Sequence, residues 1–270
     1  MPAIEVDDLA QISARLEAAV REAGALARTM FGAPLKNWTK GPTSSPVSEA
    51  DIAVDDLLRE RLMAGNDAIA WLSEESADNP VRLAARYVWI VDPIDGTRAY
   101  IAGLPDWAVS AALVENGRPV VACLYAPVAD QFFTARANAG ATCNGTAIAA
   151  TAGAALDGAR IAGPRNLIER LTAVVPPFTL IPRLRSLALR LAQVAHGACD
   201  VAFAGGNSHD WDLAAADLLV HEAGGALTSI TGETVTYNRP VPRHGMLVAA
   251  GRDRHAALIE LLGDGRLAFS

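Results

Sequence analysis

The hexapeptide DPIDGT at residues 92–97 constrains this chain of 270 residues more than any other feature. It follows YVWIV (87–91), a compact aromatic and β-branched run that predicts a buried strand ending at Asp92. Such a strand delivers two carboxylates, Asp92 and Asp95, three residues apart at its carboxyl end. Pro93 stiffens the turn between them, and Gly96 allows the backbone to approach a ligand closely.

Carboxylates beside exposed amides suit a site for phosphate and magnesium. Asp92 and Asp95 offer the hard oxygen ligands that Mg²⁺ prefers, and a following helical turn would expose the Gly96 and Thr97 amides to an anion. The same turn alone is equally consistent with capping acids in an Asx-type turn. An EF-hand is excluded, because Gly103 stands where that loop requires Glu. The acids are also one residue further apart than in aspartyl-phosphate phosphatases, which disfavours covalent catalysis by Asp92.

Three further acidic turns lie at the edges of predicted elements. Ser48–Asp51 is a capping box that opens a helix to about Met63. Glu74 follows a short apolar run, and Asp212 lies in the first turn of a helix predicted over 211–223. Taken singly, each acid has a structural explanation as a cap, a solvated loop residue or a partner of the helix dipole. The four acidic turns in this order require a joint explanation.

Composition narrows the class of protein. Hydrophobic residues make up 51% and charged residues 20%, which allows a sizeable core and excludes wholesale disorder. The net charge of −7 argues against a protein that coats nucleic acid. No apolar run reaches the ~18 residues of a membrane span, no secretory signal is visible, and the three cysteines form no CxxC motif. We therefore expect a cytoplasmic protein with neither polymeric nucleic acid nor a membrane as partner.

The pattern of predicted elements changes along the chain. A first helix is expected over about 8–31 and a loop over 36–47, followed by antiparallel strands on either side of the turn signal Asn116-Gly117. The second half alternates between strands and helices. This organisation predicts two layered α/β subdomains, residues 1–150 and 151–270, that share one cleft. The expected later elements are strands at 108–114, 119–126, 131–135, 160–162, 178–181, 201–204 and 246–250, and helices over 184–194, 211–223 and the C-terminal segment.

The four motifs together resemble the inositol monophosphatase superfamily of magnesium-dependent, lithium-sensitive phosphatases. The matching stretches are TKGPTSSPVSEAD (39–51), WLSEES (71–76), WIVDPIDGTRAY (89–100) and HDWDLAAADLLVHEAGG (209–225). The resemblance implies a layered α-β-α-β-α sandwich and a homodimer. It also implies a phosphomonoesterase that acts on a small phosphorylated metabolite.

The resemblance further implies the metal ligands. Glu74, Asp92 and the carbonyl of Ile94 would bind a first magnesium ion. Asp92, Asp95 and Asp212 would bind a second, and a third, weaker ion would again use Glu74. Two such ions clamp a phosphate while one of them lowers the pKa of the attacking water.

The remaining roles carry over in the same way. Asp51 and Thr97, together with Glu74, would orient or deprotonate the attacking water. The Gly96 and Thr97 amides would grip the phosphate, and Asp95 and Asp212 would lie on the leaving-group side. No nucleophilic Ser, Cys or His is required by this scheme.

Three departures from the family pattern bear on the substrate. Ser73 replaces the usual Gly, a change seen among nucleotide-directed members. Gly205 stands where inositol-specific members carry a Glu that contacts the ring hydroxyls. Arg185 replaces a usual Gly and could bind a second phosphate, although a solvated helix-end cation explains it equally well.

These departures favour 3′(2′),5′-bisphosphate nucleotides, such as 3′-phosphoadenosine 5′-phosphate, as the substrate. Inositol 1-phosphate is the alternative and histidinol phosphate the third. A catalytically silent scaffold or regulatory protein is the non-enzyme alternative, against which the complete set of acids argues.

Overall fold

The computed structural model describes residues 6–41, 45–65, 68–172 and 175–263. Its centre is strand β4 (Tyr87–Asp95), all nine residues of which are buried. Val88 and Ile90 face one hydrophobic core, whereas Trp89 and Val91 face another. Because helices cover both faces, the strand is a continuous apolar run and not an alternating one.

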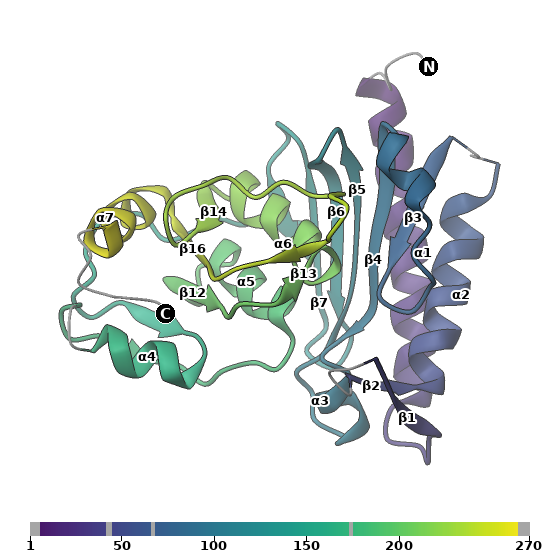
Figure 1. Ribbon diagram of the computed structural model, residues 1–270, viewed down its shortest axis with the longest axis horizontal. Coiled ribbons are helices and arrows are strands. Elements are labelled where there is room, and N and C mark those ends of the chain that lie inside the picture. Colours follow the sequence, from purple (N-terminus) through teal and green to yellow (C-terminus); the bar gives the residue numbers. More distant parts are fainter. Residues whose placement is uncertain (1–5, 42–44, 66–67, 173–174, 264–270) are drawn as a thin grey trace.

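Five layers build the molecule (Figure 1). Helices α1 (Val6–Met30) and α2 (Glu49–Met63) cover one face of a seven-stranded sheet, and α5 (Leu187–Ala195) and α6 (Asp210–Glu222) lie between that sheet and a five-stranded one. Helices α4 (Arg165–Leu171) and α7 (Arg252–Gly263) cover the outer face. This is the expected α-β-α-β-α sandwich.

The two sheets differ in their pairing. The seven-stranded sheet runs in the order β3-β4-β5-β6-β7-β8-β9, in which only β3 and β4 are parallel. The five-stranded sheet has the order β11-β10-β12-β16-β14 and mixes both directions. Their remaining bounds are β3 Ile69–Ser73, β5 Ala108–Glu115, β6 Arg118–Ala126, β7 Gln131–Arg136, β8 Ala141–Cys143, β9 Thr146–Ala147, β10 Arg160–Ala162, β11 Thr179–Leu180, β12 Val201–Ala204, β14 Gly225–Ser229 and β16 Leu247–Gly251.

Several expected elements are confirmed. Ser48 and Asp51 form the capping box of α2, and Asn116 and Gly117 both take positive φ angles in the β5–β6 turn. The helix expected from residue 184 begins only at Leu187, because the side chain of Ser186 caps it by accepting a hydrogen bond from the Leu189 amide. Strands β3 and β14 and helix α4 were not expected, since their short sequences carry little periodicity.

Two expectations about the site region are wrong. The segment expected as a loop contains a hairpin of β1 (Asn37–Lys40) and β2 (Ser45–Ser48); Pro46 is tolerated because each strand of this pair is an edge strand. Strand β4 does not end at Asp92. A register shift between Asp92 and Asp95 keeps the strand paired with β5, so that the two acids occupy a β-bulge.

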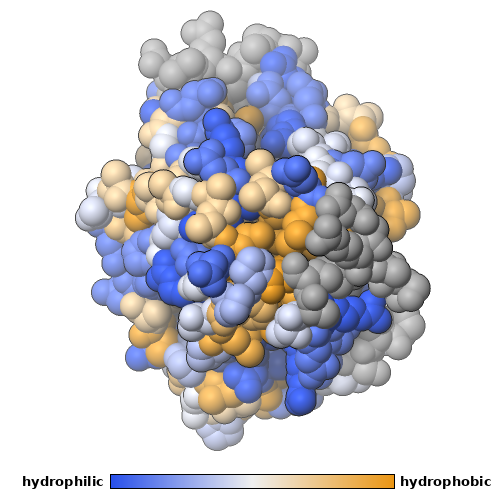
Figure 2. All heavy atoms as spheres, turned by 90° about the vertical axis from the view of Figure 1, so that its left-hand side faces the viewer, coloured by the Kyte–Doolittle hydropathy of each residue, from blue (hydrophilic) through white to orange (hydrophobic). Residues whose placement is uncertain are grey.

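The division at residue 150 stays a prediction. The strands pass from one sheet to the other between β9 and β10, yet α6, from the second half, packs on the first sheet. Seen from the side of α4 and α7, the surface mixes hydrophilic and hydrophobic residues, and hydrophobic ones gather toward its middle (Figure 2). None of the helices in the described part of the chain is long and apolar enough to cross a bilayer.

Candidate active site

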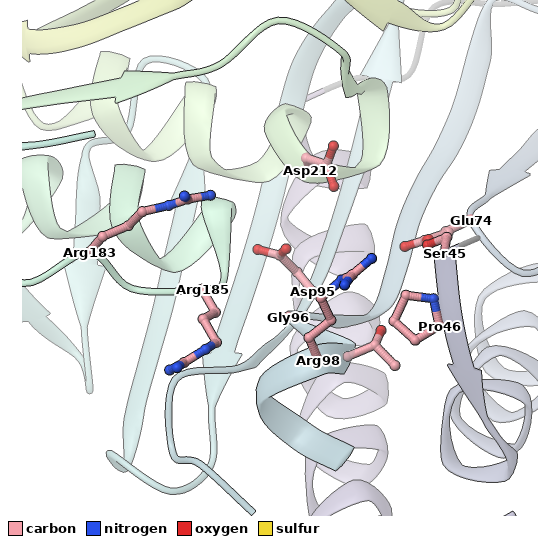
Figure 3. A pocket seen from close by; sticks show the side chains of 10 residues that line it. Ser45, Pro46, Glu74, Asp95, Gly96, Arg98, Arg183, Arg185 and Asp212 are labelled. Carbon is pink, nitrogen blue, oxygen red and sulfur yellow. The ribbon is translucent and has the colours of Figure 1, made fainter. Parts of the chain in front are cut away.

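Three carboxylates from distant parts of the chain meet at one end of the central helix layer. Asp92 and Asp95 come from the bulge of β4, and Asp212 comes from the first turn of α6. One carboxylate oxygen from each lies within 4.8 Å of the others. Figure 3 shows Asp95 and Asp212 in the same cleft, with Glu74 on the side of Ser45 and Pro46.

Asp92 is the most unusual member of this cluster. It is 1% exposed, and neither carboxylate oxygen has a hydrogen-bond partner within the described residues. Burial first, and then the negative charges of Glu74, Asp95 and Asp212, raise its pKa well above the ordinary value. A buried carboxylate without donors is unstable unless a cation or a proton neutralises it. The unpartnered oxygens therefore fit a hard divalent cation.

Asp95 and Asp212 each accept hydrogen bonds through one of their two carboxylate oxygens. Oδ2 of Asp95 accepts hydrogen bonds from Ser186 Oγ and from the Ala188 amide, both at 2.6 Å. Oδ2 of Asp212 accepts the His209 amide at 2.6 Å, as the acid of a capping box. Burial raises the pKa of both acids despite these bonds. The anchoring bonds fix each carboxylate while its Oδ1 remains available as a ligand.

Glu74 lies just after β3 and is held by a lysine that the sequence reasoning did not single out. Lys40 Nζ lies 3.3 Å from Glu74 Oε1, donates to the Glu74 carbonyl at 2.9 Å, and lies 2.6 Å from Glu75 Oε1. Burial raises the pKa of Glu74 even though Lys40 opposes the shift, and the pKa of Glu75 rises to about 7 for the same reason. Lys40 belongs to the matched stretch 39–51, and this motif was the sequence signal that could have identified it.

Asp51 and Thr97 form a buried pair behind the acids. Thr97 Oγ1 lies 2.9 Å from Asp51 Oδ1 and 3.0 Å from the carbonyl oxygen of Ile94, so its single proton can be donated to either. Ser48 donates to the other oxygen of Asp51 through its amide at 2.8 Å and its hydroxyl at 2.6 Å. Burial raises the pKa of Asp51. Its carboxylate is thus oriented toward Thr97.

Gly96 connects the bulge to helix α3 (Thr97–Ile101) and has no tolerance for a side chain. Its φ of +97° favours glycine, and a Cβ would lie 3.0 Å from the Asp106 carbonyl oxygen and 3.2 Å from the Ser186 amide. The close approach lets Ser186 reach Asp95. The amides of Gly96 and Thr97 stand at the start of this short helix.

A cavity of about 550 Å³ opens over the acids and is also bordered by arginines. Figure 3 shows Arg183 and Arg185 on the opposite side of Asp95 from Glu74. The Arg185 guanidinium lies 3.4 Å from Asp106, whereas no hydrogen bond or ion pair within the described residues engages Arg183. The full lining comprises Ser45, Pro46, Glu74, Asp95, Gly96, Thr97, Arg98, Arg183, Arg185 and Asp212.

Sequence motifs therefore mark every acid that lines this cleft but few of its cations. Asp51, Asp92 and Ile94 are buried and do not contribute to the lining, and Gly205 follows β12 outside it. The catalytic, ligand and substrate roles given to these residues stay predictions. Arg98 follows the DPIDGT motif directly, but Arg183 had no motif to mark it.

Comparisons with known proteins agree with the arrangement. The profile of the Inositol monophosphatase family matches residues 8–265. An inositol-1-monophosphatase of Rhizobium meliloti is 34% identical over 202 residues, which cover 72% of this chain and 75% of that protein. A histidinol-phosphatase of Mycobacterium tuberculosis is 34% identical over 222 residues (77% and 83%), and the 3′(2′),5′-bisphosphate nucleotidase CysQ of Aggregatibacter actinomycetemcomitans is 30% identical over 206 residues (73% and 76%).

A solved structure shows the same fold over nearly the full length. The extragenic suppressor protein SuhB from Bartonella henselae superimposes with a TM-score of 0.82 at 29% identity, covering 93% of this chain and 98% of that one.

The acid cluster predicts an unusual pH dependence of stability for Asp92→Asn. Because the folded-state pKa of Asp92 is raised, the native protein holds a proton that the unfolded chain releases above about pH 4. In EDTA, the parent should therefore lose unfolding free energy relative to Asp92→Asn as the pH rises from 4 to 8. Thermal unfolding should show the melting temperature of the variant exceeding that of the parent by a margin that grows with pH.

The matched control is Asp56→Asn, which removes one carboxylate from the exposed side of α2. Its difference from the parent should stay small and nearly constant over the same range. A melting temperature of Asp92→Asn that falls below that of the parent at pH 8 in EDTA would contradict the repulsion described here.

Proposed function

The chain belongs to the inositol monophosphatase family and is a metal-dependent phosphomonoesterase, and we propose that its substrates are 3′(2′),5′-bisphosphate nucleotides. One observation carries the chemistry: both carboxylate oxygens of buried Asp92 lack a hydrogen-bond donor among the described residues, and the negative charges of four more acids act on this group. Mg²⁺ dependence is general in the family. The number of ions and the roles of individual residues belong to the proposal.

We assign the ligands that the family resemblance implies, and the grouping of Asp92, Asp95 and Asp212 supports this assignment. Glu74, Asp92 and the carbonyl of Ile94 would hold one Mg²⁺, and Asp92, Asp95 and Asp212 a second. A third, weaker ion would use Glu74. When bound, magnesium offsets the charge of the phosphate and lowers the pKa of water. The anchoring of Asp95 by Ser186 and of Asp212 by His209 keeps their free oxygens in place without an ion.

Thr97 and Asp51 are suited to orient the attacking water and accept its proton. With its proton directed at Asp51, the Thr97 hydroxyl can accept a hydrogen bond from water through a lone pair. Proton transfer from water to Thr97, coupled to transfer from Thr97 to Asp51, would leave the carboxyl group neutral. The raised pKa of buried Asp51 favours that outcome.

The phosphate and the leaving group would lie on opposite sides of Asp95. The amides of Gly96 and Thr97 can donate to the phosphate oxygens where α3 begins. Asp95 and Asp212 lie toward Arg183 and Arg185 (Figure 3). In this proposal, the two arginines would form a positive wall next to the leaving group. Because no described residue pairs with Arg183, its guanidinium could form a bidentate pair with a second phosphate on the substrate.

A base-sized cavity adjoins the same wall. It has a volume of about 470 Å³ and is lined mainly by apolar side chains, with Asp106, Gln131, Arg190 and Gln193 at polar positions. Asp106 borders this cavity and pairs with Arg185, which borders the cleft. A nucleoside bearing two phosphates would therefore match the spatial order of these features: the acids, then the arginines, then the apolar cavity.

Inositol 1-phosphate and histidinol phosphate remain the alternative substrates, because relatives bearing those names are each 34% identical to this chain. Neither compound carries a second phosphate for Arg183. A silent scaffold would not need the complete acid set with its Thr97–Asp51 pair. The homodimer and the cytoplasmic location stay predictions.

We expect Arg183→Ala to separate these substrates. Loss of one charge-assisted contact of about 1.5–3 kcal/mol should lower kcat/KM for 3′-phosphoadenosine 5′-phosphate about 10- to 100-fold. The same variant should change kcat/KM for inositol 1-phosphate by less than about threefold, since that compound has no second phosphate. Phosphate release with and without Mg²⁺ from these two substrates and histidinol phosphate supplies the measurement.

Arg252→Ala, on the exposed start of α7, is the control that removes an equal charge elsewhere. A parent enzyme that prefers inositol 1-phosphate, or an equal loss for both substrates in Arg183→Ala, would refute the nucleotide assignment. No Mg²⁺-dependent release from any of the three would favour the scaffold.

Thr97→Ala should lower kcat about 10²-fold and leave KM nearly unchanged, because the hydroxyl acts on the attacking water and not on the bound phosphate. Thr97→Ser retains the hydroxyl and should recover most of the rate. Steady-state kinetics at saturating Mg²⁺ would test both variants. A rise in KM alone for Thr97→Ala, or no recovery in Thr97→Ser, would remove Thr97 from the proton path.

A further inference from the structure

Asp55 is a buried carboxylate one helical turn after Asp51 on α2. It is 4% exposed, and no ion pair engages it within the described residues. Its two oxygens accept hydrogen bonds from two hydroxyl groups, Ser73 Oγ to Oδ1 at 2.5 Å and Ser76 Oγ to Oδ2 at 2.6 Å. One carboxylate on a helix therefore binds both ends of a four-residue turn.

That turn carries the two acids of the WLSEES motif. Ser73 Oγ also accepts the Glu75 amide at 3.3 Å, and Ser76 Oγ accepts Trp71 Nε1 at 3.2 Å. The Glu74 amide donates to the carbonyl of Val91 at 3.3 Å, one residue before the β4 bulge. The turn is thus tied to α2 through side chains and to β4 through its backbone.

A buried carboxylate that pairs only with neutral hydroxyls is a poor choice for stability alone. Its desolvation is offset only in part by two hydrogen bonds, and a well-packed apolar residue would cost less. Groups that orient metal ligands, by contrast, commonly take this form, because outer hydrogen bonds hold the ligand in its binding position. Helix α2 would then be a common support, with Asp51 directed at Thr97 and Asp55 at the turn of Glu74.

We propose that Asp55 is a positioning residue that acts through Ser73 and Ser76 to hold the Glu74 carboxylate in its metal-binding position. The inference rests on the proposed function, since it assumes that Glu74 is a ligand. This positioning role would be exerted from outside the cleft, because Asp55 itself does not border the cavity. Without the Asp55 carboxylate, residues 73–76 would be held by fewer hydrogen bonds. Binding of a metal ion would then have to order this turn.

The test measures binding of Mn²⁺ to the metal-stripped protein by electron paramagnetic resonance, without substrate. Asp55→Asn should lower the affinity for Mn²⁺ by about 10- to 100-fold, at the same site that Glu74→Gln weakens. Asp56→Asn, the exposed neighbour on the same helix, should change affinity by less than about twofold. Thermal unfolding in EDTA confirms that each variant is folded.

A double-mutant cycle separates positioning from a general structural effect. If Asp55 acts through Glu74, adding Asp55→Asn to Glu74→Gln should weaken Mn²⁺ binding no further. Full additivity of the two losses would overturn the inference. If Asp55→Asn fails to fold, Ser76→Ala takes its place with an expected loss of several-fold, and Ser76→Thr, which keeps the hydroxyl, should restore binding.

The outcomes distinguish this inference from the function on which it rests. Parent-like Mn²⁺ affinity in Asp55→Asn, together with weak binding in Glu74→Gln, would refute the positioning role alone. Parent-like affinity in Glu74→Gln would instead remove Glu74 from the proposed ligands. Activity measurements are not needed for either decision.

Discussion

Mutual repulsion among buried carboxylates is the constraint around which this structure is arranged. Asp92, Asp95 and Asp212 bring oxygens within 4.8 Å of one another, and no donor among the described residues reaches the Asp92 carboxylate. In the absence of cations, such a cluster lowers the free energy of unfolding. Burial of apolar side chains in the three hydrophobic cores must offset this loss. Binding of a divalent cation at the proposed site would relieve the same repulsion.

The fold holds these charges together by distributing their supports over different layers. The β4 bulge presents Asp92 and Asp95, the first turn of α6 presents Asp212, and Ser186 at the start of α5 anchors Asp95. Helix α2 on the far side of the sheet supplies Asp51. These acids and their anchors come from four elements, β4, α6, α5 and α2, so assembly of the layers and formation of the acid cluster are one event.

Much of this was predictable from local patterns, and the rest depends on tertiary contacts. The capping box at Ser48, the buried run before Asp92 and the Asn116-Gly117 turn each specify their own structure within a few residues. The bulge was missed because it is defined by pairing with β5, and the hydroxyl that holds Asp95 lies 91 residues away. The acids were found because motifs mark them. Lys40 lies in the matched stretch 39–51, but its contacts with Glu74 and Glu75 depend on the fold, as does the place of Arg183 beside the cleft.

Ser186 also limits which residues before α5 can change without loss of the anchor of Asp95. Arg183 and Arg185 border the cleft from the segment that precedes α5, and neither side chain forms a hydrogen bond or ion pair with Asp92, Asp95 or Asp212 in the described structure. The next residue, Ser186, anchors Asp95 and packs its amide against Gly96. During divergence, exchange of residues 183–185 would alter the wall of the cleft and leave the anchor of Asp95 intact, whereas a change one position further would remove the hydroxyl that holds this acid.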